Sequence, residues 1–384
     1  MKDRYHFLFA SDSFKGTLSC QDTIRLLTQA AKQVFPDSEC EGVPVADGGE
    51  GTVDAVLAAE GGKRVKVTAH DPLMKKRDAF YGMIGSGRAV IEMSAASGLP
   101  LVPTEQRNPL LTSSYGTGEM IRDALDRGIR DISVAIGGSA TNDGGMGCLR
   151  ALGIRFLDQG GKPLEGRGED LEKVCSIDRS GLDPRVKEAH ITVMCDVTNP
   201  LTGPAGATMT YGKQKGGTPE MLERLEAGMC NFREVVLRET GVDADRIPGS
   251  GAAGGLGAAL AIFLGGEMRS GIETVLDLVH FKKRLSGVDL VITGEGCADR
   301  QSCYGKVMQG VGRQAKAMNI PVIGLCGSLG EGHEELLKFG ITTLLTTTIT
   351  WVPWEEIMSR AEEFYFEGAV RMFEMIRADA GFPV

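Results

Sequence analysis

The chain of 384 residues is poor in aromatic residues and in positive charge. Aromatic residues make up 6% of it, which argues against a stacking platform for bases or sugar rings. Lysine and arginine number 42 against 51 aspartate and glutamate residues, so the net charge is −9. An acidic chain without a basic run lacks the charge pattern that binds nucleic acid or an anionic membrane. We therefore expect neither as a partner.

The nine cysteines include no C-x-x-C pair, which excludes a zinc ribbon and a thioredoxin-type motif. Most lie in apolar stretches, as Cys148 and Cys326 do, and buried free thiols indicate a reducing compartment. The first apolar run, residues 7–10, is too short for the core of a signal peptide. The longest weakly polar stretch, residues 254–266, is too short to span a bilayer. The sequence therefore predicts a soluble, cytoplasmic protein.

Apolar residues, at 42%, are numerous enough to build large cores, and the length favours two domains. Glycine is abundant, with 53 residues gathered at the ends of apolar runs. This distribution predicts tight turns and backbone surfaces that a ligand can approach closely.

Both ends of the chain alternate short apolar runs with helical periodicity, a pattern typical of a parallel, doubly wound sheet. The middle of the chain has mixed strands with fewer crossovers. The predicted fold class is therefore α/β. A flavodoxin-like or Rossmann-like parallel-sheet domain, residues 1–65 and 285–384, carries an inserted mixed α/β domain, residues 66–284. We expect the active site in the cleft between them.

Five strands are expected in the outer domain, together with a helix at residues 20–35 that Ser19 caps and Asp22 supports in its first turn. Further helices are expected at residues 52–59 and 307–317, and a long closing helix at 354–380. The expected strands are residues 7–10, 42–46, 288–293, 321–326 and 342–347.

Ligands of parallel sheets bind at the carboxyl ends of the strands, and almost every predicted strand here ends in glycine, Ser or Thr, and a carboxylate. Glycine-rich turns direct backbone N–H groups at anions, and carboxylates hold hard cations such as Mg²⁺. Lysines neutralise the charge that develops in phosphoryl transfer. The candidates from these segments and from one later loop are Asp12, Ser13, Lys15, Asp47, Gly48, Gly49, Glu50, Ser139, Thr141, Asn142, Asp143, Asp196, Asn199, Lys215, Gly294, Glu295 and Asp299.

Several of these residues also fit structural roles. Asp12 and Asp47 are suited to turns or helix caps, and residues 142–144 form a typical turn sequence. Asp196 adjoins an apolar strand, where a buried carboxylate needs a partner or a metal. Lys215 also fits a solvated surface position.

The sequence has no Walker A loop. Residues 249–254 match G-x-G-x-x-G, but a proline precedes them and no apolar strand leads in, so a packing role at a helix start is favoured over a dinucleotide site.

Several long segments stand out along the chain: SDSFKGTL, PVADGGEGT, IGGSATNDGG, CDVTNPL, YGKQKG and ITGEG. In this order, and over nearly the whole length of the chain, they resemble the type I glycerate kinases. The resemblance implies phosphorylation of D-glycerate by ATP with Mg²⁺, usually giving 2-phosphoglycerate, with 3-phosphoglycerate as the other product. The chain departs from the family where Ser11 replaces a usual proline and Cys297-Ala298 replaces a basic residue and isoleucine. Arg300 or another residue would then substitute for the missing basic group.

From this resemblance we hypothesise in-line phosphoryl transfer, with catalytic roles for Asp12, Lys15, Asp196 and Asp299. Asp196 and Glu295 are the predicted metal ligands, and the other candidates would bind substrate or nucleotide. The expected partners are ATP and D-glycerate, and homo-oligomer formation is left open. Two alternatives are a non-catalytic sugar-acid-binding protein and an NAD(P)-dependent oxidoreductase that uses residues 249–254.

Overall fold

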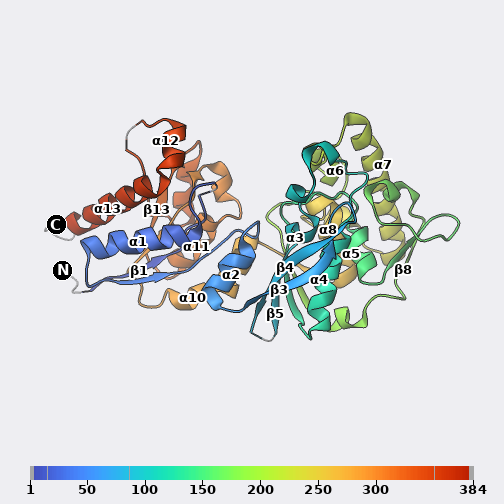
Figure 1. The fold of residues 1–384 in the computed structure, drawn as a ribbon, viewed down its shortest axis with the longest axis horizontal. Coiled ribbons are helices and arrows are strands. Elements are labelled where there is room, and N and C mark those ends of the chain that lie inside the picture. Colours follow the sequence, from blue (N-terminus) through green and yellow to red (C-terminus); the bar gives the residue numbers. More distant parts are fainter. Residues whose placement is uncertain (1–3, 15, 86, 350, 380–384) are drawn as a thin grey trace. The chain divides into compact units, whose positions relative to one another are not determined.

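The structure is a computed structural model that describes residues 4–14, 16–85, 87–349 and 351–379 (Figure 1). The chain divides into two units. Unit 1 comprises Met1–Asp47, Ala58–Glu60 and Gly271–Val384, and unit 2 comprises Gly48–Leu57 and Gly61–Ser270. This division assigns residues 48–57 and 61–65 to unit 2 and 271–284 to unit 1. The expected location of the active site between the domains stays a prediction.

Unit 1 is built on a five-stranded sheet in the order β15-β13-β11-β1-β2, in which every neighbouring pair is parallel. Numbered along the chain, this is the 2-1-3-4-5 order of a flavodoxin-like sheet, which confirms the predicted fold class. The strands are β1 (His6–Phe9), β2 (Glu39–Gly42), β11 (Leu290–Thr293), β13 (Val322–Cys326) and β15 (Thr343–Thr346); β12 (Cys297–Ala298) and β14 (Ser328–Leu329) form a separate pair.

Alternate residues of these strands face opposite helical layers, as the two-residue period of a strand requires. Phe7 and Phe9 pack with α1 and α13, which lie side by side (Figure 1). On the other face, Met308 of α11 lies against Gly324 of β13. The helices of unit 1 are α1 (Cys20–Val34), α9 (Gly271–Leu278), α10 (Phe281–Arg284), α11 (Val307–Ala317), α12 (Trp354–Ser359) and α13 (Ala361–Asp379).

Unit 2 contains a six-stranded sheet in the order β10-β9-β6-β5-β4-β3. The four strands from β10 to β5 are parallel, and β4 is antiparallel to both of its neighbours. The strands are β3 (Lys63–His70), β4 (Lys76–Ile84), β5 (Arg88–Glu92), β6 (Asp131–Ala135), β9 (His190–Met194) and β10 (Glu267–Arg269); β7 (Arg155–Leu157) pairs with β8 (Ser176–Asp178). The helices are α3 (Ser94–Ser97), α4 (Tyr115–Asp126), α5 (Met146–Ala151), α6 (Ala207–Tyr211), α7 (Pro219–Thr240) and α8 (Ala252–Leu264), and α2 (Thr52–Glu60) is in unit 2 except for its last three residues, which are in unit 1.

Local sequence signals located several elements well. Ser19 caps α1 through its side chain, as predicted, and Asp22 lies in the first turn. The Asp22 carboxylate also accepts a hydrogen bond from the Ser19 N–H, so the two residues form a capping box. Helix α11 has the predicted bounds.

Two predicted elements were wrong. The strand predicted at 42–46 ends at Gly42. The Val43 N–H still donates to the Phe9 carbonyl oxygen of β1, but the residues from Val43 onwards are outside the strand and buried, and burial alone gave them an apolar, strand-like sequence. The closing helix is two helices, α12 and α13, which meet at Arg360 in a non-helical conformation (φ −121°, ψ 27°). Neither proline nor glycine marks this break in the sequence.

The core of unit 1 depends on an aromatic cluster around Phe373 of α13. Its ring centroid lies 5.1 Å from that of Phe7 and 6.3 Å from that of Phe9, and its side chain is fully buried. We expect Phe373→Ala to lower the free energy of unfolding by about 3–5 kcal/mol, because it removes these contacts and leaves a cavity.

Urea unfolding measures this loss. Met375→Ala on the same helix, where the side chain is 60% exposed, is the matched control and should change stability by less than about 0.5 kcal/mol. Equal losses in the two variants would contradict the assigned core.

Candidate active site

In unit 1, the loops that follow β1 and β11 lie side by side at the point where the strand order reverses, which is where sheets of this type bind ligands. The Asp12 N–H donates to the carbonyl oxygen of Gly294 at 2.9 Å. Asp12 Oδ1 accepts a hydrogen bond from the Ser13 N–H at 2.7 Å. Phe14 anchors the first loop edge-on against Tyr365 of α13. Asp12, Ser13 and Gly294 are therefore brought together, whereas Lys15 lies outside the described residues.

Glu295 follows directly in the second loop and is 7% exposed. Its Oε2 lies 3.7 Å from Lys306 Nζ, and among the described residues Oε1 has no hydrogen-bond partner. Burial raises the pKa of the Glu295 carboxyl, while a hydrogen bond from Ser302 and the charge of Lys306 act in the opposite direction. A buried acceptor of this kind is costly unless a ligand, a cation or a proton satisfies it.

Asp299, four residues after Glu295 in the chain, has a structural role. It caps the 3₁₀ helix Arg300–Cys303, since its Oδ1 accepts from the Gln301 N–H at 2.7 Å and its own N–H donates to Ser302 Oγ at 3.0 Å. Cys297 is exposed, and Arg300 pairs at 3.5 Å with exposed Glu331.

In unit 2, the turn after β6 is organised by Asp143, which is fully buried. Asp143 Oδ2 accepts from the Ser114 N–H at 2.7 Å, from Ser114 Oγ at 2.8 Å and from the Gly147 N–H at 3.2 Å, and Oδ1 accepts from the Gly145 N–H at 3.1 Å. Burial raises the pKa of this carboxyl, and these hydrogen bonds lower it. Asp143 thus acts as an anchor of the turn, a role that its acceptor-only chemistry explains.

Three residues of unit 2 form what we call the turn cluster: Thr141, Asn142 and Lys215. Lys215 is 2% exposed and donates from Nζ to the Thr141 carbonyl oxygen at 2.7 Å. Asn142 Nδ2 donates to Thr208 Oγ1 at 3.0 Å. Within the part of the chain that the structure describes, Thr141 Oγ1 and Asn142 Oδ1 are buried without a partner. Burial lowers the pKa of Lys215 to about 7.

The glycine-rich loop at residues 249–255 supports this turn. The Gly144 N–H donates to the Gly254 carbonyl oxygen at 2.9 Å, and a Cβ on Gly254 would lie 2.1 Å from the Thr141 carbonyl oxygen. A 3₁₀ helix, Ala244–Arg246, and not a strand, precedes the loop. The loop therefore lacks the strand that a dinucleotide fingerprint requires and packs at the start of α8.

The remaining candidates are not part of the turn cluster. Gly49 comes close to Gly137, where a Cβ would lie 3.5 Å from the Gly49 Cα. Asp196 is exposed and accepts a hydrogen bond from Ser270 Oγ at 2.9 Å. Asn199 donates to the Ala205 carbonyl oxygen at 2.7 Å and accepts from the Tyr211 hydroxyl at 2.7 Å. The other four positions are half-buried Asp47, which belongs to unit 1, and, in unit 2, buried Gly48, exposed Glu50 and largely buried Ser139.

Sequence reasoning did not single out Glu92, at the end of β5. Its Oε1 accepts from the Val53 N–H at the start of α2 at 2.7 Å, and burial raises the pKa of its carboxyl. A carboxylate directly after the buried run 89–91 was the available signal.

The described residues contain no group of three or more His, Cys, Asp or Glu side chains that could hold a metal ion. Mg²⁺ in nucleotide sites needs only one or two protein carboxylates, because the phosphates and waters supply the other ligands.

Among the described residues, no helix is long and apolar enough to cross a membrane.

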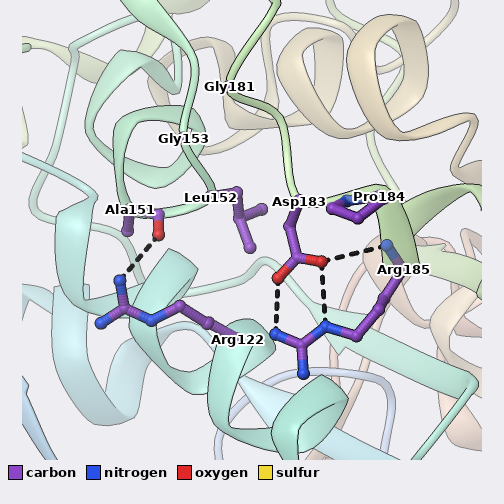
Figure 2. Close-up of a pocket in the computed structure, with 8 residues that line it drawn as sticks. All are labelled: Arg122, Ala151, Leu152, Gly153, Gly181, Asp183, Pro184 and Arg185. Carbon is purple, nitrogen blue, oxygen red and sulfur yellow. Dashed lines mark hydrogen bonds and ion pairs between the residues drawn. The ribbon is translucent and has the colours of Figure 1, made fainter.

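A surface hollow of about 410 Å³ lies elsewhere in unit 2 (Figure 2). Its charged groups already pair: Asp183 binds Arg185 through Nε at 2.9 Å and Nη2 at 2.6 Å, and Arg122 donates to the Ala151 carbonyl oxygen at 3.1 Å (Figure 2). None of the predicted site residues lines it.

Comparison with known proteins agrees with this architecture. The model of the glycerate kinase family matches residues 7–377. The chain belongs to the glycerate kinase family. It is therefore an ATP-dependent kinase that acts on a hydroxyl group, and the family resemblance expected from the sequence is confirmed.

Individual relatives are similar over most of their length. The chain is 44% identical to a glycerate kinase of Haemophilus influenzae over 358 residues, 93% of this chain and 95% of that one. It is 45% identical to a glycerate 2-kinase of Escherichia coli over 340 residues, 88% of this chain and 89% of that one. A crystal structure assigned as glycerate kinase 2 of Salmonella typhimurium LT2 superposes with a TM-score of 0.89 at 44% identity, covering 99% of this chain and 100% of that one.

Two glycines test the packing of the turn cluster. Gly254 and Gly265 share φ +67°, but a Cβ meets backbone atoms at Gly254 and nothing within 4 Å at Gly265. Both alanine variants carry the backbone strain of the left-handed region, roughly 1–2 kcal/mol. Gly254→Ala should lose about 1–3 kcal/mol more in thermal unfolding, because the Thr141 backbone must move. Equal losses would show that the loop does not press on the turn.

The buried lysine predicts a pH dependence of stability. Lys215 has a pKa of about 7 in the folded chain against 10.5 ordinarily, so between these values the unfolded chain holds a proton that the folded chain lacks. Its contribution to stability therefore rises with pH across this window, by at most about 1.4 kcal/mol per pH unit. We therefore expect the free energy of unfolding in urea to rise with pH, from pH 7 upwards, for the wild type relative to Lys215→Met. Parallel profiles would contradict the shifted pKa.

Proposed function

We propose that the protein phosphorylates D-glycerate with ATP and Mg²⁺ and that the product is 2-phosphoglycerate. The observation that carries the proposal is the 44–45% identity, over most of both chains, to proteins named glycerate kinase and glycerate 2-kinase. The buried Oε1 of Glu295 beside Lys306, which has no hydrogen-bond partner among the described residues, supports it, because this group lies at the ligand-binding edge of the unit 1 sheet.

In the proposed reaction, a hydroxyl oxygen of glycerate forms a bond to the γ-phosphorus of ATP. The bond from that phosphorus to the β–γ bridging oxygen breaks, and ADP leaves. The hydroxyl proton passes to a carboxylate, for which Asp12 is our first candidate. The Asp12 N–H donates to the Gly294 carbonyl oxygen, and Asp12 Oδ1 accepts from the Ser13 N–H, so the position of Asp12 is fixed before substrate binds.

Lys306 and the turn cluster would contribute binding. Lys306 would neutralise charge on phosphate oxygens from its place beside Glu295. Thr141 Oγ1 and Asn142 Oδ1, which no described residue satisfies, are acceptors suited to substrate hydroxyl groups. Lys215 would hold the Thr141 carbonyl oxygen in place.

The donor chemistry fits Mg²⁺, which prefers carboxylate and phosphate oxygens. Glu295 in unit 1 is the first candidate ligand, and Asp196 in unit 2 is the second. When bound, the ion would neutralise charge on the phosphate oxygens. Asp299 is a weaker candidate for a direct role, since its Oδ1 already caps a helical turn.

An ADP-release assay with ATP, Mg²⁺ and D-glycerate tests the proposal. We expect ADP that depends on glycerate and disappears with EDTA, and phosphorus NMR of the product would distinguish 2- from 3-phosphoglycerate. Glycerate binding by folded protein without ADP release would instead favour the non-catalytic sugar-acid-binding protein.

Asp12→Asn tests the proton acceptor. The amide oxygen can still accept from the Ser13 N–H, so the fold should be kept, while kcat should fall by about 10²- to 10⁴-fold. Glu374→Gln, at an exposed carboxylate of α13 in the same unit, is the matched control and should retain full activity. A near-normal kcat for Asp12→Asn would exclude Asp12 as the base.

A further inference from the structure

Both tryptophans of the chain lie in one exposed segment after β15. Trp351 is 86% and Trp354 67% exposed, and Ile349 and Met358 beside them are also exposed. Tryptophan is highly buried on average, so exposed indoles gathered with other apolar side chains indicate an interaction site. We call Ile349, Trp351, Trp354 and Met358 the tryptophan segment.

The segment belongs to the ligand-binding edge of unit 1. All five strands of the sheet are parallel, so the residues after β15 emerge at the same edge as Asp12 and Glu295. Helix α12, which begins at Trp354 beside the start of α13 (Figure 1), also reaches the loop after β1: Met358 Cε lies 3.5 Å from the position of a Cβ on Gly16. One face of the site thus runs from β1 to the tryptophan segment.

The dimensions favour a long ligand. In the strand order β15-β13-β11-β1, the segment starts two strand spacings from β11 and three from β1, or about 10–14 Å at a spacing of about 4.8 Å. Glycerate has only three carbons and is too short to reach across this distance. A nucleotide whose phosphates lie near Glu295 and Lys306 is long enough to span it.

The chemistry of the segment favours an uncharged ring. Residues 351–358 contain no lysine or arginine, and Glu355 and Glu356 follow the second tryptophan. The nearest arginine along the chain, Arg360, pairs with Glu356 and Glu363, so the negative charge of Glu355 still disfavours phosphates here. An indole face offers dispersion and stacking to a planar heterocycle. We propose that Trp351 and Trp354 bind the adenine ring of ATP, an inference that rests on the proposed kinase function.

This inference revises the expectation drawn from composition. An aromatic content of 6% argued against a stacking platform, but one nucleobase needs only one or two aromatic side chains. The placement of both tryptophans in one exposed segment supplies them.

Tryptophan fluorescence of the full-length protein gives a direct test, because both reporters are in the segment. We expect ADP and adenosine to change the emission and inorganic tripolyphosphate, which has no base, to leave it nearly unchanged. Equal responses to ADP and tripolyphosphate would overturn the proposal, since the signal would then follow phosphate binding.

Kinetics of variants provide the second test. Trp351→Ala or Trp354→Ala should raise the KM for ATP by about 5- to 150-fold, the range expected for one stacked base, with the KM for glycerate unchanged. The corresponding phenylalanine variant should restore much of the ATP affinity, because a ring face remains. Met375→Ala, an exposed apolar residue on α13, is the matched control and should have the wild-type KM.

An unchanged KM for ATP in both alanine variants would overturn the proposal while leaving the kinase function intact. A dimer that dissociates in those variants, again without an effect on the KM for ATP, would also overturn it and identify a second copy of the chain as the occupant. Absence of glycerate-dependent ADP from the wild type would instead contradict the proposed function itself.

Discussion

Parallel strands bring the loops that follow them to a common edge of the sheet, and the chemistry of this protein depends on that constraint. In unit 1 it places Asp12 and Glu295, which are 283 residues apart in the chain, in adjacent loops joined by a backbone hydrogen bond to Gly294. The same constraint brings the segment after β15 to that edge. Separate stretches of sequence, each with one polar group, thereby become one surface.

Hydrogen-bond satisfaction separates anchoring groups from groups available to a ligand. Asp143 accepts four hydrogen bonds from protein donors and is therefore part of the framework of its turn. Glu295, Asn142 and Thr141 each keep a buried oxygen that no described residue satisfies. A buried acceptor left unpaired costs free energy, and a substrate or cation that pairs with it recovers that cost on binding. Hydrogen bonding thus distinguishes Asp143 from Glu295, Asn142 and Thr141, although the sequence made all four equivalent candidates.

The predicted elements show where local sequence is informative. The Ser19 capping box and the bounds of α11 follow from side chains close in sequence, so they could be predicted. The buried segment after Gly42 resembled a strand because burial in any conformation favours apolar residues. No proline or glycine marks the break at Arg360 in the sequence, although the backbone leaves the helical conformation there. Glu92 went unnoticed since its partner, the Val53 N–H, comes from a distant helix.

The sequence by itself determined the fold class, the family and the residue types of the site, because apolar periodicity and long motifs are local properties of the chain. The tertiary structure decided which of those residues are anchors and which retain free acceptors. It also decided that Lys215 is buried and that both tryptophans are exposed at the ligand-binding edge. Burial and pairing depend on partners brought from distant positions, and no single stretch of sequence contains that information.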